Sequence, residues 1–121
     1  MKILATTAGS LPAKRKADYL FEICEKLAAE LIVLHVIRET DNYADGERAL
    51  DIFRAKTGQK VRAIMRIGGL AETIAKVAEE YEVNLVILGI DPKSELANQI
   101  SSEVYLNTGI PVLIVPTLTR E

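Results

Sequence analysis

The chain has 121 residues, of which 49% are hydrophobic and 26% are charged, and its formal net charge is −2. A chain of this length folds as one domain with one core, and the composition is that of an ordinary globular protein. The near-neutral charge argues against a nucleic acid partner, because a phosphate-backbone binder needs surplus Lys and Arg on one face. We therefore expect a single domain over residues 1–121.

Targeting and redox signals are few. The apolar run after Lys2 is too short for a signal peptide, and no stretch approaches the roughly 18 apolar residues of a membrane span. The single cysteine, Cys24, excludes an intrachain disulfide and falls in an apolar helical stripe, which predicts a small core residue. The single histidine, His35, has no second histidine with which to form a metal pair or a triad. These features predict a cytoplasmic protein with no membrane partner and no metal site.

Short apolar runs alternate with helical patterns from end to end, which indicates βαβ units around a parallel sheet. The runs that predict strands are Lys2 to Thr7, Leu31 to Ile37, Lys60 to Arg66, Leu85 to Leu88 and Pro111 to Val115. Apolar residues at three- and four-residue steps predict helices between them. The expected inward residues are Leu20, Cys24, Leu27, Ala28 and Leu31, then Ala49, Leu50 and Phe53 over residues 47–56, then Leu70, Ile74, Val77, Ala78 and Tyr81, then Leu96, Ile100 and Val104. Gly58 and Gly109 follow helix ends, as terminators do.

The strands differ in polarity, and this difference predicts their places in the sheet. In the third strand, apolar Val61, Ala63, Met65 and Ile67 alternate with charged Lys60, Arg62 and Arg66, and Ile64 interrupts the pattern. Such a strand suits a sheet edge with one charged face. The first, second and fourth strands are almost wholly apolar, as central parallel strands buried on both faces are.

Three parts of the chain together resemble the universal stress protein family. They are residues 2–10 with 31–36, the stretch GGLAETIAKVAEEYEVNLVILG, and TGIPVLIVP. The resemblance covers nearly the whole chain. It implies an α/β fold of the adenine nucleotide alpha hydrolase-like type, with one open parallel five-stranded sheet in the order 3-2-1-4-5 and helices on both faces. This order agrees with the edge position that charge predicts for the third strand.

Nucleotide binders of this family share an Asp after the first strand and the motif G-x-x-G-x9-G-[ST] after the fourth. Here Ala8 replaces the Asp and Pro92 replaces the second glycine, while Asn98 and Gln99 stand where Gly-Ser belongs. The loop is also four residues short. A proline offers no N–H group, and each lost glycine prevents close backbone approach to phosphate. We therefore expect no ATP binding tighter than roughly 100 μM.

The candidate ligand-binding residues lie where the carboxyl ends of the predicted strands meet. They are Thr7, Ala8, Gly9, Ser10, Val36, Gly89, Asn98, Gln99 and Ser101. The resemblance implies that the main chain of Val36 would face an adenine, with Gly9, Ser10 and Ser101 as polar contacts. Independently of it, Thr6, Thr7 and Ser10 follow or end the first strand, where open α/β sheets bind ligands. The free N–H groups of the fourth helix, near Lys93 or Ser94, suit a small anion such as phosphate.

Three hypotheses for the function follow from these observations. The favoured function is a universal-stress-type regulatory or binding module with no catalytic residues and no cofactor. The alternative is a member that binds ATP or AMP, with Mg²⁺, through the altered loop, and at most hydrolyses ATP slowly. A third hypothesis is a flavodoxin-like carrier, because TTAGSLPA resembles a flavin-phosphate loop. A phospho-receiver domain is excluded, because the third strand ends in MRIGG without the Asp that accepts phosphate.

The last strand predicts a homodimer. An exposed edge reading VLIV, with no inward charge, would be an aggregation hazard in a monomer. Antiparallel pairing with a twofold mate would satisfy its free backbone groups. The predicted interface residues are Pro111, Val112, Leu113, Ile114 and Val115. The family resemblance implies the same interface.

Overall fold

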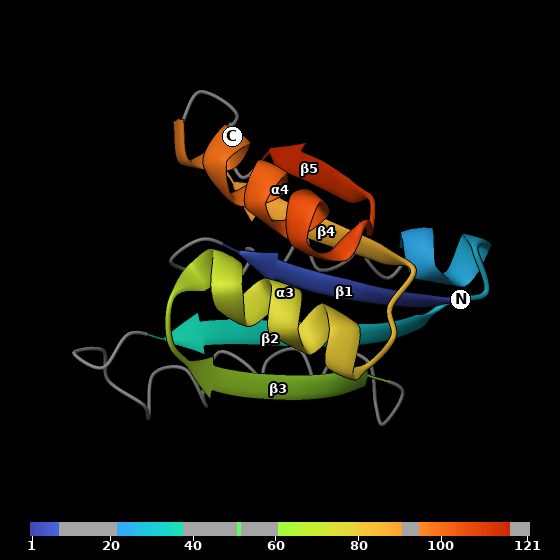
Figure 1. Cartoon of the computed structure of the whole chain (residues 1–121). Coiled ribbons are helices and arrows are strands. Elements are labelled where there is room, and N and C mark those ends of the chain that lie inside the picture. The colour runs from blue at the N-terminus through green and yellow to red at the C-terminus, as the bar shows by residue number, and fades with distance from the viewer. Residues whose placement is uncertain (8–21, 38–50, 52–60, 91–94, 117–121) are drawn as a thin grey trace, which may run out of the picture.

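A computed structural model describes residues 1–7, 22–37, 51, 61–90 and 95–116. Its sheet has five strands in the order β3-β2-β1-β4-β5 (Figure 1). The strands are β1 (Lys2–Thr7), β2 (Glu30–Ile37), β3 (Val61–Ile67), β4 (Leu85–Ile90) and β5 (Val112–Pro116). All neighbouring pairs are parallel. The predicted α/β class and strand order are confirmed. The order differs from the 2-1-3-4-5 order of flavodoxin-like sheets, so the flavodoxin-like hypothesis is wrong.

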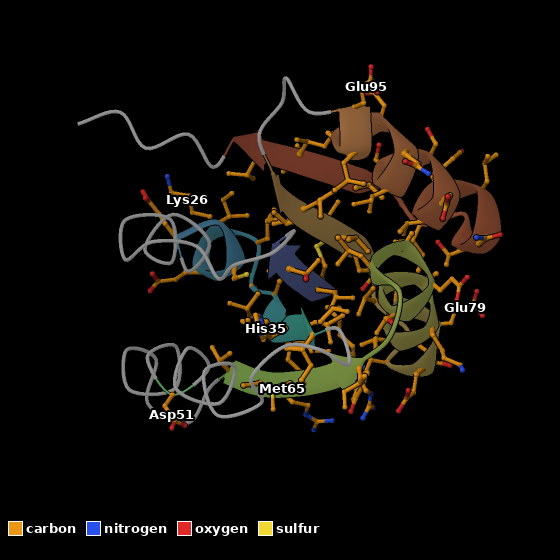
Figure 2. The ribbon with its side chains drawn as sticks, turned by 90° about the vertical axis from the view of Figure 1, so that its left-hand side faces the viewer. Lys26, His35, Asp51, Met65, Glu79 and Glu95 are labelled. Atoms are coloured by element: carbon orange, nitrogen blue, oxygen red, sulfur yellow. The ribbon has the colours of Figure 1, made fainter. Side chains whose placement is uncertain are left out.

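Helical segments cover both faces of the sheet, as predicted. Helices α3 (Leu70–Glu80) and α4 (Glu95–Thr108) pack on one face. Residues 22–26 are helical and pack on the other, and Figure 2 shows Lys26 and Glu79 on opposite sides of the sheet. Of the helix predicted over residues 47–56, only Asp51 lies within the described residues, and Gly58 lies outside them.

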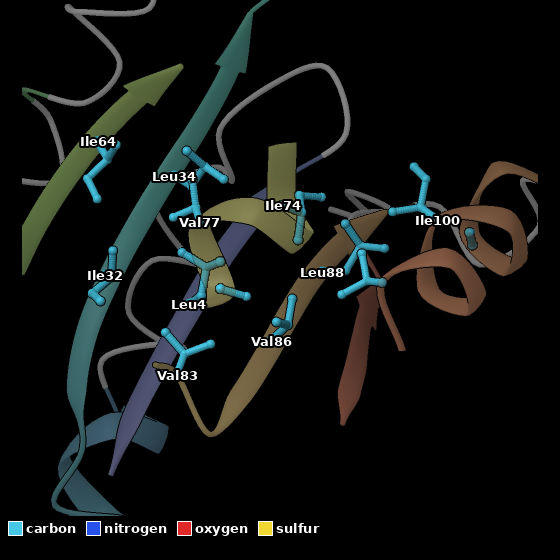
Figure 3. Close-up of a cluster of buried hydrophobic side chains, with 13 residues drawn as sticks. Leu4, Ile32, Leu34, Ile64, Ile74, Val77, Val83, Val86, Leu88 and Ile100 are labelled. Atoms are coloured by element: carbon cyan, nitrogen blue, oxygen red, sulfur yellow. The ribbon is translucent and has the colours of Figure 1, made fainter. Parts of the chain in front are cut away.

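The larger core cluster fills the space between the sheet and helices α3 and α4. Leu4, Leu34 and Leu88 reach it from adjacent strands, and Ile74 of α3 is wholly buried among them (Figure 3). The predicted inward residues of α3 are confirmed, because Ile74, Val77 and Ala78 are buried and Leu70 and Tyr81 pack against the cluster.

A smaller cluster lies on the opposite face. Ile3, Ala5, Val33 and Ile87 alternate along their strands with the residues of the larger cluster, since successive side chains of a strand point to opposite faces. Two buried faces explain why β1, β2 and β4 have no polar side. Cys24 packs in this cluster, which confirms its prediction as a small core residue.

Two predicted helix faces are wrong in part. The helical segment ends at Lys26 and a turn follows, with Ala28 in the left-handed region at φ 50°. Leu27 is therefore 47% exposed, and Leu31 is buried as a residue of β2 and not of a helix. In α4 the buried residues are Ala97, Ile100 and Val104, and Leu96 is 44% exposed. Gly109, at φ +70°, ends α4 as predicted.

Strand β3 lies at the sheet edge as predicted, but its faces differ from the prediction. Ile64, which interrupts the sequence pattern, is buried against the α3 side, whereas Ile67 is 57% exposed. Arg62 and Arg66 share the face of Ile64 and reach the end of α3. The guanidinium of Arg62 lies 5.4 Å from the centre of the Tyr81 ring, and Arg66 pairs with Glu80 at 3.1 Å. These contacts let an edge strand carry charge on a face that also packs on a helix.

Candidate functional site

The sheet reverses its winding direction between β1 and β4. The chain runs from β1 outward through β2 to β3, then crosses to β4 and continues to β5. In open α/β sheets, ligands bind beyond the carboxyl ends of the strands at this kind of reversal. The register places Thr7, at the end of β1, beside buried Gly89 of β4. The structure thus brings together two of the predicted site residues at the expected position.

Thr6 lies one residue before this point and is only 3% exposed. Its hydroxyl Oγ1 has no hydrogen-bond partner within the part of the chain that the structure describes. The register places Thr6 between Leu34 of β2 and Leu88 of β4. Thr6 was singled out in the sequence by its position, but its lack of a partner appears only in the structure.

The carboxyl ends of β2 and β3 form a second part of the same edge. Val36 pairs with Arg66, is half-buried, and packs against the larger cluster. Exposed Ile67 lies beside Ile37 in the next register position. The sequence analysis placed Ile67 on the apolar face of the third strand. The sequence feature that indicates the end of the strand at Ile67 is the pair of glycines that follows it.

Gly68 turns the chain from β3 toward α3. Its N–H group donates to the Ile37 carbonyl at 3.1 Å, and its φ of +154° is rare for residues with a side chain. A Cβ atom at this position would lie 2.8 Å from Oγ1 of Thr73. Glycine is therefore needed here to hold the ends of β2 and β3 together.

The predicted residues on α4 belong to a helix and not to the strands whose carboxyl ends form this edge. Asn98 and Gln99 are exposed on the helix. The Ser101 hydroxyl lies 2.7 Å from the Ala97 carbonyl and 3.2 Å from that of Asn98, so its proton stays within the helix. The remaining candidates, Ala8, Gly9 and Ser10, lie outside the described residues, as do Pro92, Lys93 and Ser94.

Groups suited to other chemistry are sparse in the described regions. No group of three or more His, Cys, Asp and Glu side chains there could hold a metal ion. Burial raises the pKa of the Cys24 thiol to about 11, so it is protonated at neutral pH and a poor nucleophile. His35 pairs with Met65 in register, and both appear on the same side of the sheet in Figure 2. Among the described helices, none combines the length and apolarity needed to span a membrane.

No protein-family model and no curated protein matches the sequence. Solved structures do match over nearly its whole length. A universal stress protein in complex with cAMP is 22% identical, with a TM-score of 0.71 and 98% of each chain covered. The hypothetical protein MJ0577 is 24% identical, with a TM-score of 0.75 over 98% of this chain and 97% of its own.

A third match is a universal stress protein family protein from Arabidopsis thaliana with AMP bound. It is 13% identical, with a TM-score of 0.66 over 98% of this chain and 94% of its own. The strand order, the two core clusters and these matches agree with one another. The chain has the fold of the universal stress proteins.

Proposed function

We propose that this protein is a universal-stress-type regulatory module that binds an adenine nucleotide with a single phosphate group, such as AMP or cAMP, and catalyses no reaction. The observation that carries this proposal is the reversal point between β1 and β4, where Thr7 and Gly89 lie side by side at the carboxyl edge. Structures of the same fold with cAMP or AMP bound support it.

The preference for one phosphate follows from the loop after β4. Gly89 is retained, but Pro92 has no N–H group to donate, and Asn98 and Gln99 replace the later Gly-Ser. A triphosphate needs several amide donors at close approach, whereas a single phosphate needs fewer. Ala8 also lacks the carboxylate that nucleotide binders of the family place there.

The state of the described side chains that could act as a nucleophile or a base supports a non-catalytic role. The Cys24 thiol is buried and protonated at neutral pH. His35 lies within β2 and packs on the face away from α3 and α4. We further propose a cytoplasmic location and a role in the stress response, both of which rest on the family resemblance.

We also propose that the protein is a homodimer through β5. Within the described residues, β5 pairs only with β4, and Leu113 on it is 43% exposed. An apolar edge of this kind is stabilised when a second copy pairs with its free N–H and C=O groups.

Light scattering should give a dimer at micromolar concentration, and Leu113→Lys should convert it to a monomer. Leu106→Lys is the matched control, because Leu106 is 79% exposed but lies on α4 and not on the edge strand. A monomeric wild type, or a Leu113→Lys variant that remains dimeric, would contradict this interface.

The ligand proposal is tested by mass spectrometry of small molecules released from protein that was incubated with AMP, cAMP and ATP and then desalted. We expect AMP or cAMP to be retained in preference to ATP. Retention of ATP alone, or of none of the three together with no binding heat for AMP or cAMP, would contradict the proposal.

A further inference from the structure

The Thr6 hydroxyl is an exception among the buried groups of this protein. Thr6 is the one polar residue in the buried class within the described residues, and it is 3% exposed. Its Oγ1 atom has no hydrogen-bond partner there. Leaving a buried hydroxyl without a partner is unfavourable, since it gives up its hydrogen bonds to water on folding. Such a group calls for an explanation outside the packing of the core.

The surroundings of Thr6 offer no reason within the fold for a hydroxyl at this position. Because side chains alternate along β1, Thr6 faces the same side as Leu4, toward α3 and α4. Leu34 and Leu88 flank it on the neighbouring strands, and both belong to the same apolar cluster. Valine has the same shape without the polar atom, so packing alone would favour valine.

The position of Thr6 supplies the explanation. It precedes Thr7, which pairs with Gly89 at the reversal point of the sheet. We propose that the Thr6 hydroxyl is a specificity-determining contact that donates a hydrogen bond to an acceptor atom of the bound adenylate. This inference rests on the proposed function, and it adds a residue whose polar atom has no other use in the described structure.

The Thr6 hydroxyl suits a neutral group of the ligand better than it suits a phosphate. A threonine hydroxyl donates one hydrogen bond and accepts up to two. It carries no charge, and its apolar neighbours would disfavour a bare phosphate close by. An adenine nitrogen or a ribose oxygen is the matching partner, because each can accept from a neutral hydroxyl.

The test compares Thr6→Val, Thr6→Ser and a control by titration calorimetry with AMP and by thermal unfolding without ligand. Thr6→Val should raise the Kd for AMP about tenfold, the loss of one hydrogen bond. Thr6→Ser keeps the hydroxyl and should stay within about threefold of the wild type. Without ligand, Thr6→Val should raise the melting temperature by about 3 °C, because no partner is lost.

Thr108→Val is the matched control. The Thr108 hydroxyl donates to the Val104 carbonyl at 2.7 Å and accepts from the Ile110 N–H at 3.1 Å. Its loss should lower the melting temperature and leave the AMP affinity unchanged. An unchanged Kd in Thr6→Val, or a lower melting temperature in that variant, would overturn the inference and leave the proposed function standing. A wild type that binds neither AMP nor cAMP would overturn both.

Discussion

The two ends of the parallel strands differ in how their polar groups are used. We call the side of the sheet where the strands begin the amino edge, and the side where they end the carboxyl edge. At the amino edge, β1 and the turn before β4 are joined by a reciprocal pair. The Lys2 N–H donates to Oδ1 of Asn84 at 2.8 Å, and the Asn84 N–H donates to the Lys2 carbonyl at 2.8 Å. The Glu30 N–H donates to the Met1 carbonyl at 2.9 Å, and Lys2 Nζ reaches the Tyr81 carbonyl at 3.3 Å.

At the carboxyl edge, the described groups are used differently. The Thr6 hydroxyl is buried without a described partner, and Ile67 is 57% exposed although it is apolar. Gly68 has a φ of +154° that few residues adopt. The described polar groups at the amino edge are hydrogen-bonded, whereas the unpaired Thr6 hydroxyl and the exposed apolar Ile67 lie at the carboxyl edge. This division is expected when one edge stabilises a parallel sheet and the other binds a ligand.

The largest effect should come from removing the Tyr81 side chain at the amino edge. Tyr81 packs against the larger core cluster, and Arg62 lies over its ring at 5.4 Å. Tyr81→Ala should lower the free energy of unfolding by about 3 kcal/mol, measured by urea denaturation, because it removes a partly buried ring and a cation–π contact. Tyr81→Phe, which keeps the ring, should be nearly neutral. Weaker AMP binding by Tyr81→Ala protein that is still folded would contradict a purely stabilising role for the amino edge.

A smaller effect should come from Cys24, which packs on the opposite face. Burial raises the folded-state pKa of its thiol from the ordinary value of 9.0 to about 11. Below pH 9 the thiol is protonated in both states, but between pH 9 and 11 the unfolded chain loses its proton first. The free energy of unfolding should therefore fall by about 2 kcal/mol by pH 11.

The control for this prediction is Cys24→Ala, which should lack this part of the pH dependence and bind AMP like the wild type. Equal pH profiles for the two proteins would show that Cys24 ionises freely in the folded state. Altered AMP affinity in Cys24→Ala would place a ligand-binding role in the smaller core cluster, where we predict a role in stability only.

The fold was predictable because it depends on patterns that extend over many residues. The strands of the sequence analysis recur within one or two residues of their observed ends, and the polarity of the third strand placed β3 at an edge. Errors arose where one residue changes the local geometry. The turn at Ala28 moved Leu27 out of the helix face, and the end of β3 left Ile67 at the surface.

Of the candidate site, only the position was predictable. The order of elements placed Thr7 and Gly89 at one edge of the sheet, as their register confirms. The state of the Thr6 hydroxyl depends instead on Leu34 and Leu88, which are distant in the chain and adjacent only after folding. No local pattern reports whether such a group has found a partner.

We propose that the carboxyl edge binds an adenylate and lacks a triphosphate cradle. Titration calorimetry of the wild type with AMP, with cAMP, and with ATP and Mg²⁺ under one set of conditions tests it most directly. We expect AMP or cAMP to bind more tightly than ATP, and ATP to bind no tighter than roughly 100 μM, on the scale of the lost amide contacts. A micromolar Kd for ATP would contradict it, because the proline and the missing glycines would then leave a working phosphate loop.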